Sequence, residues 1–193
     1  MPVSGPMVLT PECEAFRKEF EALSAAAVTL VAPLTDEQFT WQPEPDSWSV
    51  AQCIDHLNAA AREYLPKLDE GIANAIRRGQ YTSGPYQYNW IGRLMVWSMK
   101  PTTRFRAKAP QAFVPAPGRQ RSEIMAAFKA YQVQYVDRLR QSNGLDLGRA
   151  RVASPIVRWI RLPLGSAFAL AVAHEHRHLA QARRVCEAPA FPR

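Results

Sequence analysis

The sequence has few cysteines and no long apolar run. Its 193 residues include three cysteines, Cys13, Cys53 and Cys186, which are widely spaced and form no CxxC pair. This pattern argues against a zinc ribbon or a dithiol redox motif, and we expect three buried thiols. The longest nearly apolar stretch, residues 162–173, is shorter than the roughly 20 residues that cross a bilayer. We therefore expect no transmembrane helix and no membrane partner.

The N-terminus also lacks the marks of a secretory signal. Residues 1–6 contain neither a basic segment nor an apolar stretch, so we expect a cytoplasmic protein. Hydrophobic residues make up 47% of the chain and charged residues 21%, which is typical of a globular domain and not of a disordered or fibrous chain. We expect one domain over residues 10–188, with an N-terminal tail at 1–9 and a C-terminal tail at 189–193.

Acidic residues are fewer than basic ones, and the excess is +7. Such a charge can attract nucleic acid, an anionic membrane or an acidic small molecule, and does not choose among them. Phe105 and Trp97 lie among basic residues, a mixture that single-stranded nucleic acid can use. The basic residues are Lys100, Arg104, Arg106, Lys108, Arg119 and Arg121. Because no nucleic-acid motif accompanies them, we expect a solvated basic loop and keep nucleic-acid binding as an alternative.

Four segments carry helix signals. Thr10 followed by Pro11 starts a helix that should run to Val31. A capping box, Ser49 with Gln52, starts a second that should continue past a kink at Pro66 to about Gly79. The third and fourth are predicted at about 121–140 and 164–186. No segment alternates with period two, so we predict an all-α, four-helix bundle.

The segment between the second and third predicted helices is long and rich in proline. We interpret it as a crossover connection or a lid. Trp90, Leu94 and Trp97 have the spacing of one helical face, and we expect that face to pack on the bundle. The predicted fold is therefore a bundle with a long crossover connection between helices two and three.

Three of the four histidines lie close together in the predicted last helix. His174 and His178 are one turn apart on its apolar face, whereas His176 points nearly the opposite way. His56 lies on the inner face of the second helix. Two buried helices can bring three imidazoles together, and three neutral imidazoles bind a divalent metal while leaving coordination positions open. The alternative is that each ring is a hydrogen-bonded core residue.

The same segment also fits the short HExxH pattern of zinc proteases, in which the glutamate acts as a general base. The metzincin extension requires glycine and a further histidine, but Gln181 and Arg184 stand at those positions. We therefore do not expect a zincin-type protease.

Three segments together resemble the DinB-like family of metal-binding four-helix-bundle proteins. Residues 48–57, WSVAQCIDHL, resemble the family's second-helix signature, and residues 174–181, HEHRHLAQ, resemble its last-helix signature. Residues 105–115 resemble the connection before the third helix in one branch. The resemblance covers nearly the whole chain after Thr10.

The resemblance implies a three-histidine metal site with His56, His174 and His178 as ligands, holding nickel or zinc. It also implies a homodimer, and a metal-dependent thiol transferase or related enzyme that joins a low-molecular-weight thiol to an electrophile. Metal coordination would lower the pKa of that thiol. Whether the protein is an enzyme stays open, because a metal-binding or sensing protein without turnover needs the same ligands.

Further side chains are candidates for supporting roles. Gln181 follows His178 on the ligand face and is our candidate catalytic residue, with filling of a core gap as the alternative. Glu175 can accept a hydrogen bond from a ligand histidine, although a solvated surface carboxylate is the simpler expectation. Trp48 and Tyr64 can wall the pocket or belong to the ordinary core.

Overall fold

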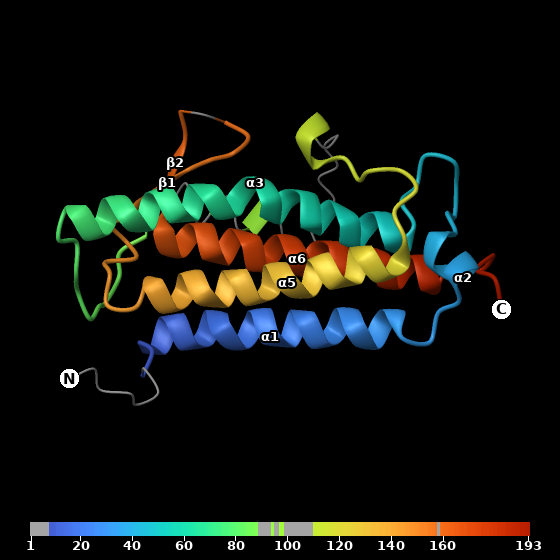
Figure 1. Cartoon of the computed structure of the whole chain (residues 1–193), viewed down its shortest axis with the longest axis horizontal. Helices are drawn as coiled ribbons and strands as arrows, with labels where there is room; N and C mark the ends of the chain where they lie inside the picture. The colour runs from blue at the N-terminus through green and yellow to red at the C-terminus, as the bar shows by residue number, and fades with distance from the viewer. Residues whose placement is uncertain (1–7, 89–93, 95–96, 99–109, 158) are drawn as a thin grey trace.

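Four long helices form the molecule and lie side by side along one axis (Figure 1). The computed structural model describes residues 8–88, 94, 97–98, 110–157 and 159–193. The long helices are α1 (Pro11–Val31), α3 (Val50–Arg77), α5 (Arg121–Gln141) and α6 (Leu164–Cys186). The predicted all-α four-helix bundle is confirmed, and each predicted helix ends within about two residues of the observed one.

The order of the helices around the bundle explains the long connection. α1 and α3 each pack against both α5 and α6, and Figure 1 shows that the neighbours α3 and α5 run in the same direction. A short turn joins only antiparallel neighbours, so the chain must return along the length of α3, about 40 Å for a helix of this size. Residues 78–120 span that return, as the predicted crossover requires.

Local chemistry sets where the helices begin and end. At the start of α3 the Ser49 hydroxyl accepts a hydrogen bond from the backbone N–H of Gln52, and the Gln52 side chain accepts one from the N–H of Ser49. The predicted capping box is thus present. Thr10 precedes α1 but its side chain makes no cap bond. Its backbone N–H instead donates to Asn143 Oδ1 at 2.8 Å.

Aromatic side chains fill the bundle interior. The largest fully buried ones are Phe20, Phe39, Phe128 and Phe168. Phe20 stacks on Tyr135 with ring centroids 4.6 Å apart, which joins α1 to α5. Each such side chain contributes roughly 1.5–3 kcal/mol through burial, so the core holds the four helices in register.

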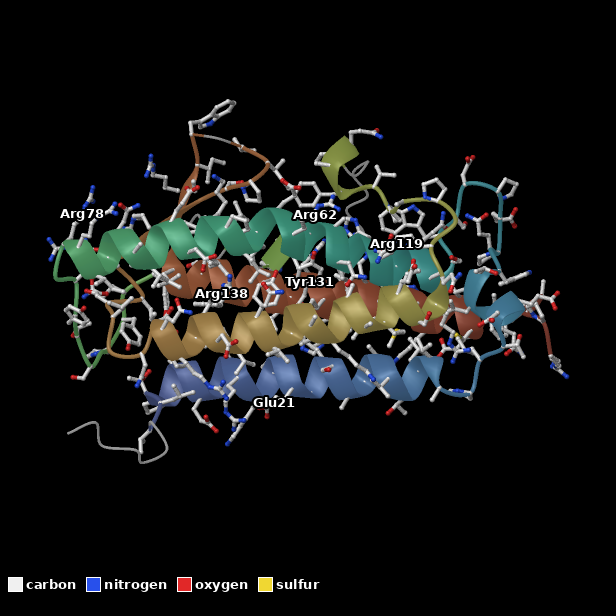
Figure 2. The ribbon with its side chains drawn as sticks, viewed as in Figure 1. Glu21, Arg62, Arg78, Arg119, Tyr131 and Arg138 are labelled. Atoms are coloured by element: carbon white, nitrogen blue, oxygen red, sulfur yellow. The ribbon has the colours of Figure 1, made fainter. Side chains whose placement is uncertain are left out.

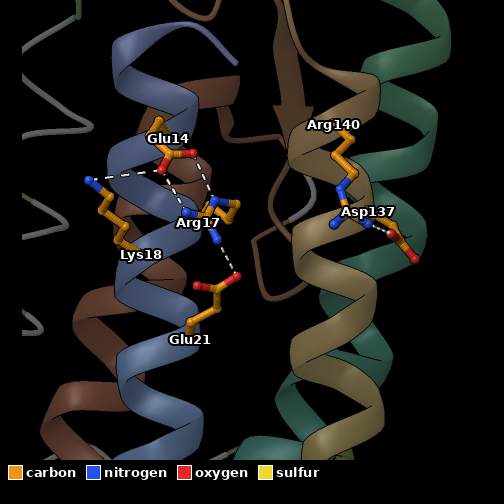
Figure 3. Close-up of polar contacts among 6 residues, drawn as sticks. All are labelled: Glu14, Arg17, Lys18, Glu21, Asp137 and Arg140. Atoms are coloured by element: carbon orange, nitrogen blue, oxygen red, sulfur yellow. Dashed lines mark hydrogen bonds and ion pairs between the residues drawn. The ribbon is translucent and has the colours of Figure 1, made fainter. Parts of the chain in front are cut away.

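Ion pairs lie both between the helices and on their outer faces. Arg138 of α5, labelled in Figure 2, donates to both carboxylate oxygens of Asp69 on α3, at 2.9 and 2.8 Å. On the outside of α1, Arg17 lies between Glu14 and Glu21 (Figure 3). The exposed pairs contribute little to stability, whereas the bidentate Arg138 pair fixes α5 against α3.

Two small elements differ from the sequence-based expectation. α2 (Asp36–Thr40) begins with its own capping box, Thr35 with Gln38, and lies between the first two predicted helices, where no helix was predicted. A short hairpin pairs β1 (Arg151–Ala153) with β2 (Arg161–Pro163) in antiparallel register. Strands of three residues are too short to show a period of two, which is why the hairpin has no sequence signature.

Other expectations meet a mixed outcome. Leu94 and Trp97 are 52% and 56% exposed, so these two side chains do not pack fully on the bundle; Trp90 lies outside the described residues. Cys13 and Cys53 are buried as expected, but Cys186 is only partly buried. Among the described residues, no helix is long and apolar enough to cross a membrane.

The capping box of α3 gives a first testable prediction. Replacing Ser49 with Ala leaves backbone donors of a buried helix end without a partner, and we expect it to lower the free energy of unfolding by about 1 kcal/mol. Urea unfolding followed by circular dichroism measures this change. Ser83→Ala, at an exposed loop serine, is the control, and an equal effect of the two substitutions would contradict the prediction.

Candidate metal centre

The structure brings His56, His174 and His178 into one cluster between α3 and α6. One ring nitrogen of each histidine lies within 4.8 Å of the corresponding nitrogens of the other two. The two helices are in direct contact, and His56 lies two turns into α3, opposite the second half of α6. Residues 118 positions apart in the sequence therefore share one site.

The three rings are steeply inclined to one another and do not stack. Their centroids are 4.4–5.0 Å apart, and their planes are inclined by 58–77°. Nε2 of His56 lies 3.1 Å from Nε2 of His174. Two nitrogens that share a zinc ion at 2.0–2.1 Å lie roughly 3–3.5 Å from each other, so this pair has a spacing that fits one metal ion.

A backbone carbonyl sets the orientation of His56. The segment before α5 contains the short 3₁₀ helix η1 (Gln111–Phe113), and the Phe113 carbonyl oxygen lies 2.7 Å from His56 Nδ1. Nδ1 must carry the proton in this bond, because a carbonyl only accepts. Nε2 is then left as the unprotonated nitrogen that faces His174, which is the tautomer that a metal ligand needs.

Burial keeps the imidazoles uncharged. It lowers the pKa of His174 to about 3, and neighbouring His56 and Arg177 add to the effect. Burial likewise lowers the pKa of His178 to about 2, with His174 and His56 contributing. For His56, burial also lowers the pKa, and the bond to the Phe113 carbonyl opposes that shift. All three rings are therefore neutral at physiological pH, the form that binds metal.

One ring nitrogen of the cluster lacks a hydrogen-bond partner among the described residues. It is Nδ1 of His178, which is buried. Unpaired nitrogens in a low-dielectric interior are costly, and a cation in their midst removes that cost. The residues present thus fit a divalent metal ion, by the chemistry of a three-imidazole donor set.

Aromatic and amide side chains border the cluster. The ring of Trp48, just before the cap of α3, lies 4.8 Å from that of His56 and 5.6 Å from that of His178. Trp48 therefore walls the site, whereas no ring contact joins Tyr64 to a histidine in the described part of the chain. Gln181 lies close enough to His178 to oppose the lowering of the His178 pKa.

The remaining residues of the 174–178 segment face elsewhere. His176 is half-exposed, and its Nε2 lies 2.9 Å from Glu19 Oε2 on α1. Its predicted outward orientation is confirmed.

Glu175 is not the solvated carboxylate that the sequence suggested. It is 4% exposed and accepts a hydrogen bond from Gln132 of α5 at 3.1 Å, while its second oxygen has no partner. Burial raises the pKa of Glu175 to about 8. Among the described residues, the hydrogen bond of this carboxyl goes to α5 and not to any of the three rings, which argues against a role as the general base of an HExxH protease.

The segment that carries the cluster of basic residues, 100–121, is only partly described. Arg119 and Arg121 are engaged by the fold: Arg119 pairs with Asp55, and Arg121 donates to the Val31 and Leu34 carbonyls. These contacts explain both residues without nucleic acid. The others, Lys100, Arg104, Phe105, Arg106 and Lys108, lie outside the described residues.

The Phe113 carbonyl and the Gln132–Glu175 pair were not anticipated. A backbone carbonyl has no sequence signature, so nothing in the residue pattern marks Phe113. Gln132 lies among the apolar positions of α5 and is 5% exposed. A polar residue on an apolar helical face is the one signal that could have indicated a buried partner.

Comparison with known proteins finds a matching family model and a solved structure with a similar fold. The family model of the DinB superfamily matches residues 19–182. YfiT from Bacillus subtilis, described as a probable metal-dependent hydrolase with an unusual four-helix bundle topology, has a similar fold. The TM-score is 0.60 at 16% identity, covering 97% of this chain and 91% of YfiT. No curated protein matches this chain.

The buried carboxyl of Glu175 predicts a specific pH dependence. Its pKa is raised to about 8 in the folded protein, so the native state keeps a proton that the unfolded chain releases near pH 4.5. The resulting stability is fully present below pH 4.5 and is lost as the pH rises through 8. Glu175→Gln stays uncharged, so we expect the variant to gain roughly 3–4 kcal/mol relative to the wild type between pH 5 and pH 8.

Chemical unfolding of the metal-free proteins at several pH values measures this difference. The histidines titrate in both proteins, so their contribution cancels in the difference between the two unfolding free energies. Glu123→Gln, at an exposed position of α5, is the control and should show a constant difference. A constant difference for Glu175→Gln as well would show that its carboxyl is ionised in the folded protein.

Proposed function

The chain belongs to the DinB superfamily, and on this basis we propose that His56, His174 and His178 bind one divalent metal ion, nickel or zinc, at the centre of a metal-dependent enzyme. The observation that carries the proposal is the convergence of three neutral ring nitrogens within 4.8 Å. Three protein ligands leave coordination positions for a substrate, as catalytic metal sites require and sealed structural sites do not.

The reaction we propose is the transfer of a low-molecular-weight thiol to an electrophile. A divalent ion held by the three rings supplies Lewis acidity, which lowers the pKa of a thiol that it binds. In the described part of the chain, the carboxylate adjacent to a ligand histidine, Glu175, is bonded to Gln132 and does not offer a base to the three rings. A thiol, whose pKa is about 8.5 in water, needs less help to ionise than water does, which favours a thiol as the nucleophile.

The surrounding residues have supporting roles in this proposal. The Phe113 carbonyl holds the His56 ring with Nε2 toward the other two histidines. Trp48 covers one side of the rings and keeps bulk water from them. Gln181, which lies next to His178, is the side chain we assign to contact the substrate.

Metal content tests the ligand assignment. We expect protein purified without an affinity tag to carry about one divalent ion per chain, measured by elemental analysis. His56→Ala, His174→Ala and His178→Ala should each lower occupancy at least about tenfold, because each removes one of three ligands. His176→Ala is the matched control from the same helix and should keep full occupancy, since its ring faces Glu19.

Two outcomes would contradict the assignment. Equal metal in His174→Ala and His176→Ala would show that the metal lies elsewhere. Wild-type protein that binds neither nickel nor zinc in a direct titration would remove the metal site. Circular dichroism checks that each variant is folded.

Activity tests the proposed reaction. We expect the metal-loaded protein to consume a thiol such as cysteine or glutathione together with 1-chloro-2,4-dinitrobenzene, forming a carbon–sulfur bond and releasing chloride. Removal of the metal by a chelator should lower the rate at least about a hundredfold, because the residues alone supply no base. Consumption at the same rate without metal would rule out the mechanism.

Hydrolysis is the second candidate, favoured by the likeness to YfiT, described as a probable metal-dependent hydrolase. Metal-dependent cleavage of an ester or amide panel without any thiol would favour it over transfer. Absence of turnover with both panels, with metal bound, would favour a binding or sensing protein. Retention on DNA at low salt that survives metal removal would support the nucleic-acid alternative. A homodimer remains part of the proposal, and sedimentation analysis measures it.

A further inference from the structure

A polar cavity lies on the face of α3 that neighbours the face with His56. It has a volume of about 310 Å³ and lies between α3, α5 and residues 114–119. Its lining consists of Asp55, Asn58, Ala59, Arg62, Val114, Ala116, Arg119, Ala127 and Tyr131. None of the three clustered histidines lines it, so it is not part of the candidate metal centre.

The helical period separates the two sites on α3. Asp55, Asn58, Ala59 and Arg62 recur at three- and four-residue steps and therefore share one face. His56 lies about 100° round the helix from Asp55 and faces α6. α3 thus presents His56 to α6 and the polar residues of the cavity to α5.

The charges of the cavity favour an anion. Two guanidinium groups, Arg62 and Arg119, oppose a single carboxylate, Asp55. Asp55 is already neutralised, because it accepts hydrogen bonds from Arg119 and from the backbone N–H of Ala116. These bonds hold Arg119 in place at the cavity. The lining itself carries one net positive charge, and the pair that Arg62 forms with Glu63, at 3.5 Å and largely exposed, is weak.

Both arginines keep donors for a ligand. Among the described residues Arg119 is engaged through Nη1, and Arg62 through Nε with Glu63 and through Nη2 with the Ala112 carbonyl. A guanidinium has five N–H donors, so each has further N–H groups. Figure 2 shows Arg62, Arg119 and Tyr131 in the same part of the bundle.

The rest of the lining sets the kind of anion. Ala59, Val114, Ala116 and Ala127 offer small apolar surfaces, and Tyr131 adds a ring with a hydroxyl. Inorganic phosphate or sulfate would leave these surfaces unused, whereas a carboxylate with a short hydrocarbon part satisfies both halves of the lining. The volume is at the lower end of small-molecule sites, which excludes a peptide-sized ligand.

We infer that this cavity binds a small organic carboxylate, whose anionic group pairs with Arg62 and Arg119 and whose hydrocarbon part contacts the alanines, Val114 and Tyr131. Planar guanidinium groups match carboxylates in a bidentate way. The inference is independent of the metal centre, because it depends on residues that do not touch the histidine nitrogens.

Calorimetric titration of the full chain with butyrate and benzoate tests this inference. Butyramide and benzamide have nearly the same shapes without the charge. We expect each carboxylate to bind at least about tenfold more tightly than its amide, because charge-assisted bonds are the stronger ones. Equal binding of acid and amide, or no binding of either carboxylate up to about 10 mM, would overturn the inference.

Two arginine variants locate the binding. Arg62→Ala should weaken carboxylate binding about tenfold and leave the amides unchanged. Arg78→Ala removes the same charge from the far end of α3 (Figure 2), and it should change the binding of neither the carboxylates nor the amides. Equal effects of both variants would show a general charge effect and overturn the assigned site. Carboxylate binding abolished by a chelator would also overturn it, by placing the ligand on a metal ion.

Discussion

Close packing of α3 against α6 is the constraint on which the candidate metal centre depends. It buries three imidazoles, and burial both lowers their pKa values and removes the water that would otherwise satisfy their nitrogens. Neutral rings with unpaired acceptors in a low-dielectric space are unfavourable by themselves. A cation that all three rings can bind turns the same arrangement into a favourable one. Helix packing and metal chemistry are therefore parts of a single energetic balance.

The bundle order has a second consequence for this site. Because α3 and α5 are parallel neighbours, the chain between them must come back toward the start of α3 before α5 can begin. That return carries η1 past the second turn of α3, where the Phe113 carbonyl meets His56 Nδ1. The crossover is thus not only a link, because it supplies the group that selects the ring tautomer. An antiparallel pair joined by a short turn would have no backbone at this place.

Periodic and capping signals in the sequence were enough to predict the four long helices. Ser49 with Gln52, and the one-turn spacing of His174 and His178, depend only on neighbours within a helix. The facing of His56 and His174 was predictable because an apolar stripe marks the inner face of each helix. By contrast, the Phe113 carbonyl, the buried Glu175 and the hairpin of β1 and β2 depend on contacts between distant segments. Such contacts leave no local period, and a charged residue at position 175 reads as exposed until α5 is placed over it.

The same short segment before α5 serves both sites of the molecule. Phe113 bonds to His56, while Val114, Ala116 and Arg119 line the cavity on the neighbouring face of α3. Arg62 also donates to the Ala112 carbonyl, one residue before Phe113. Arg62 thus both lines the cavity and supports the backbone next to the carbonyl that orients His56. The two sites therefore share one supporting segment, residues 112–119, while their own lining residues differ: the histidine rings meet on the α6 side of α3, and the cavity is lined from the α5 side.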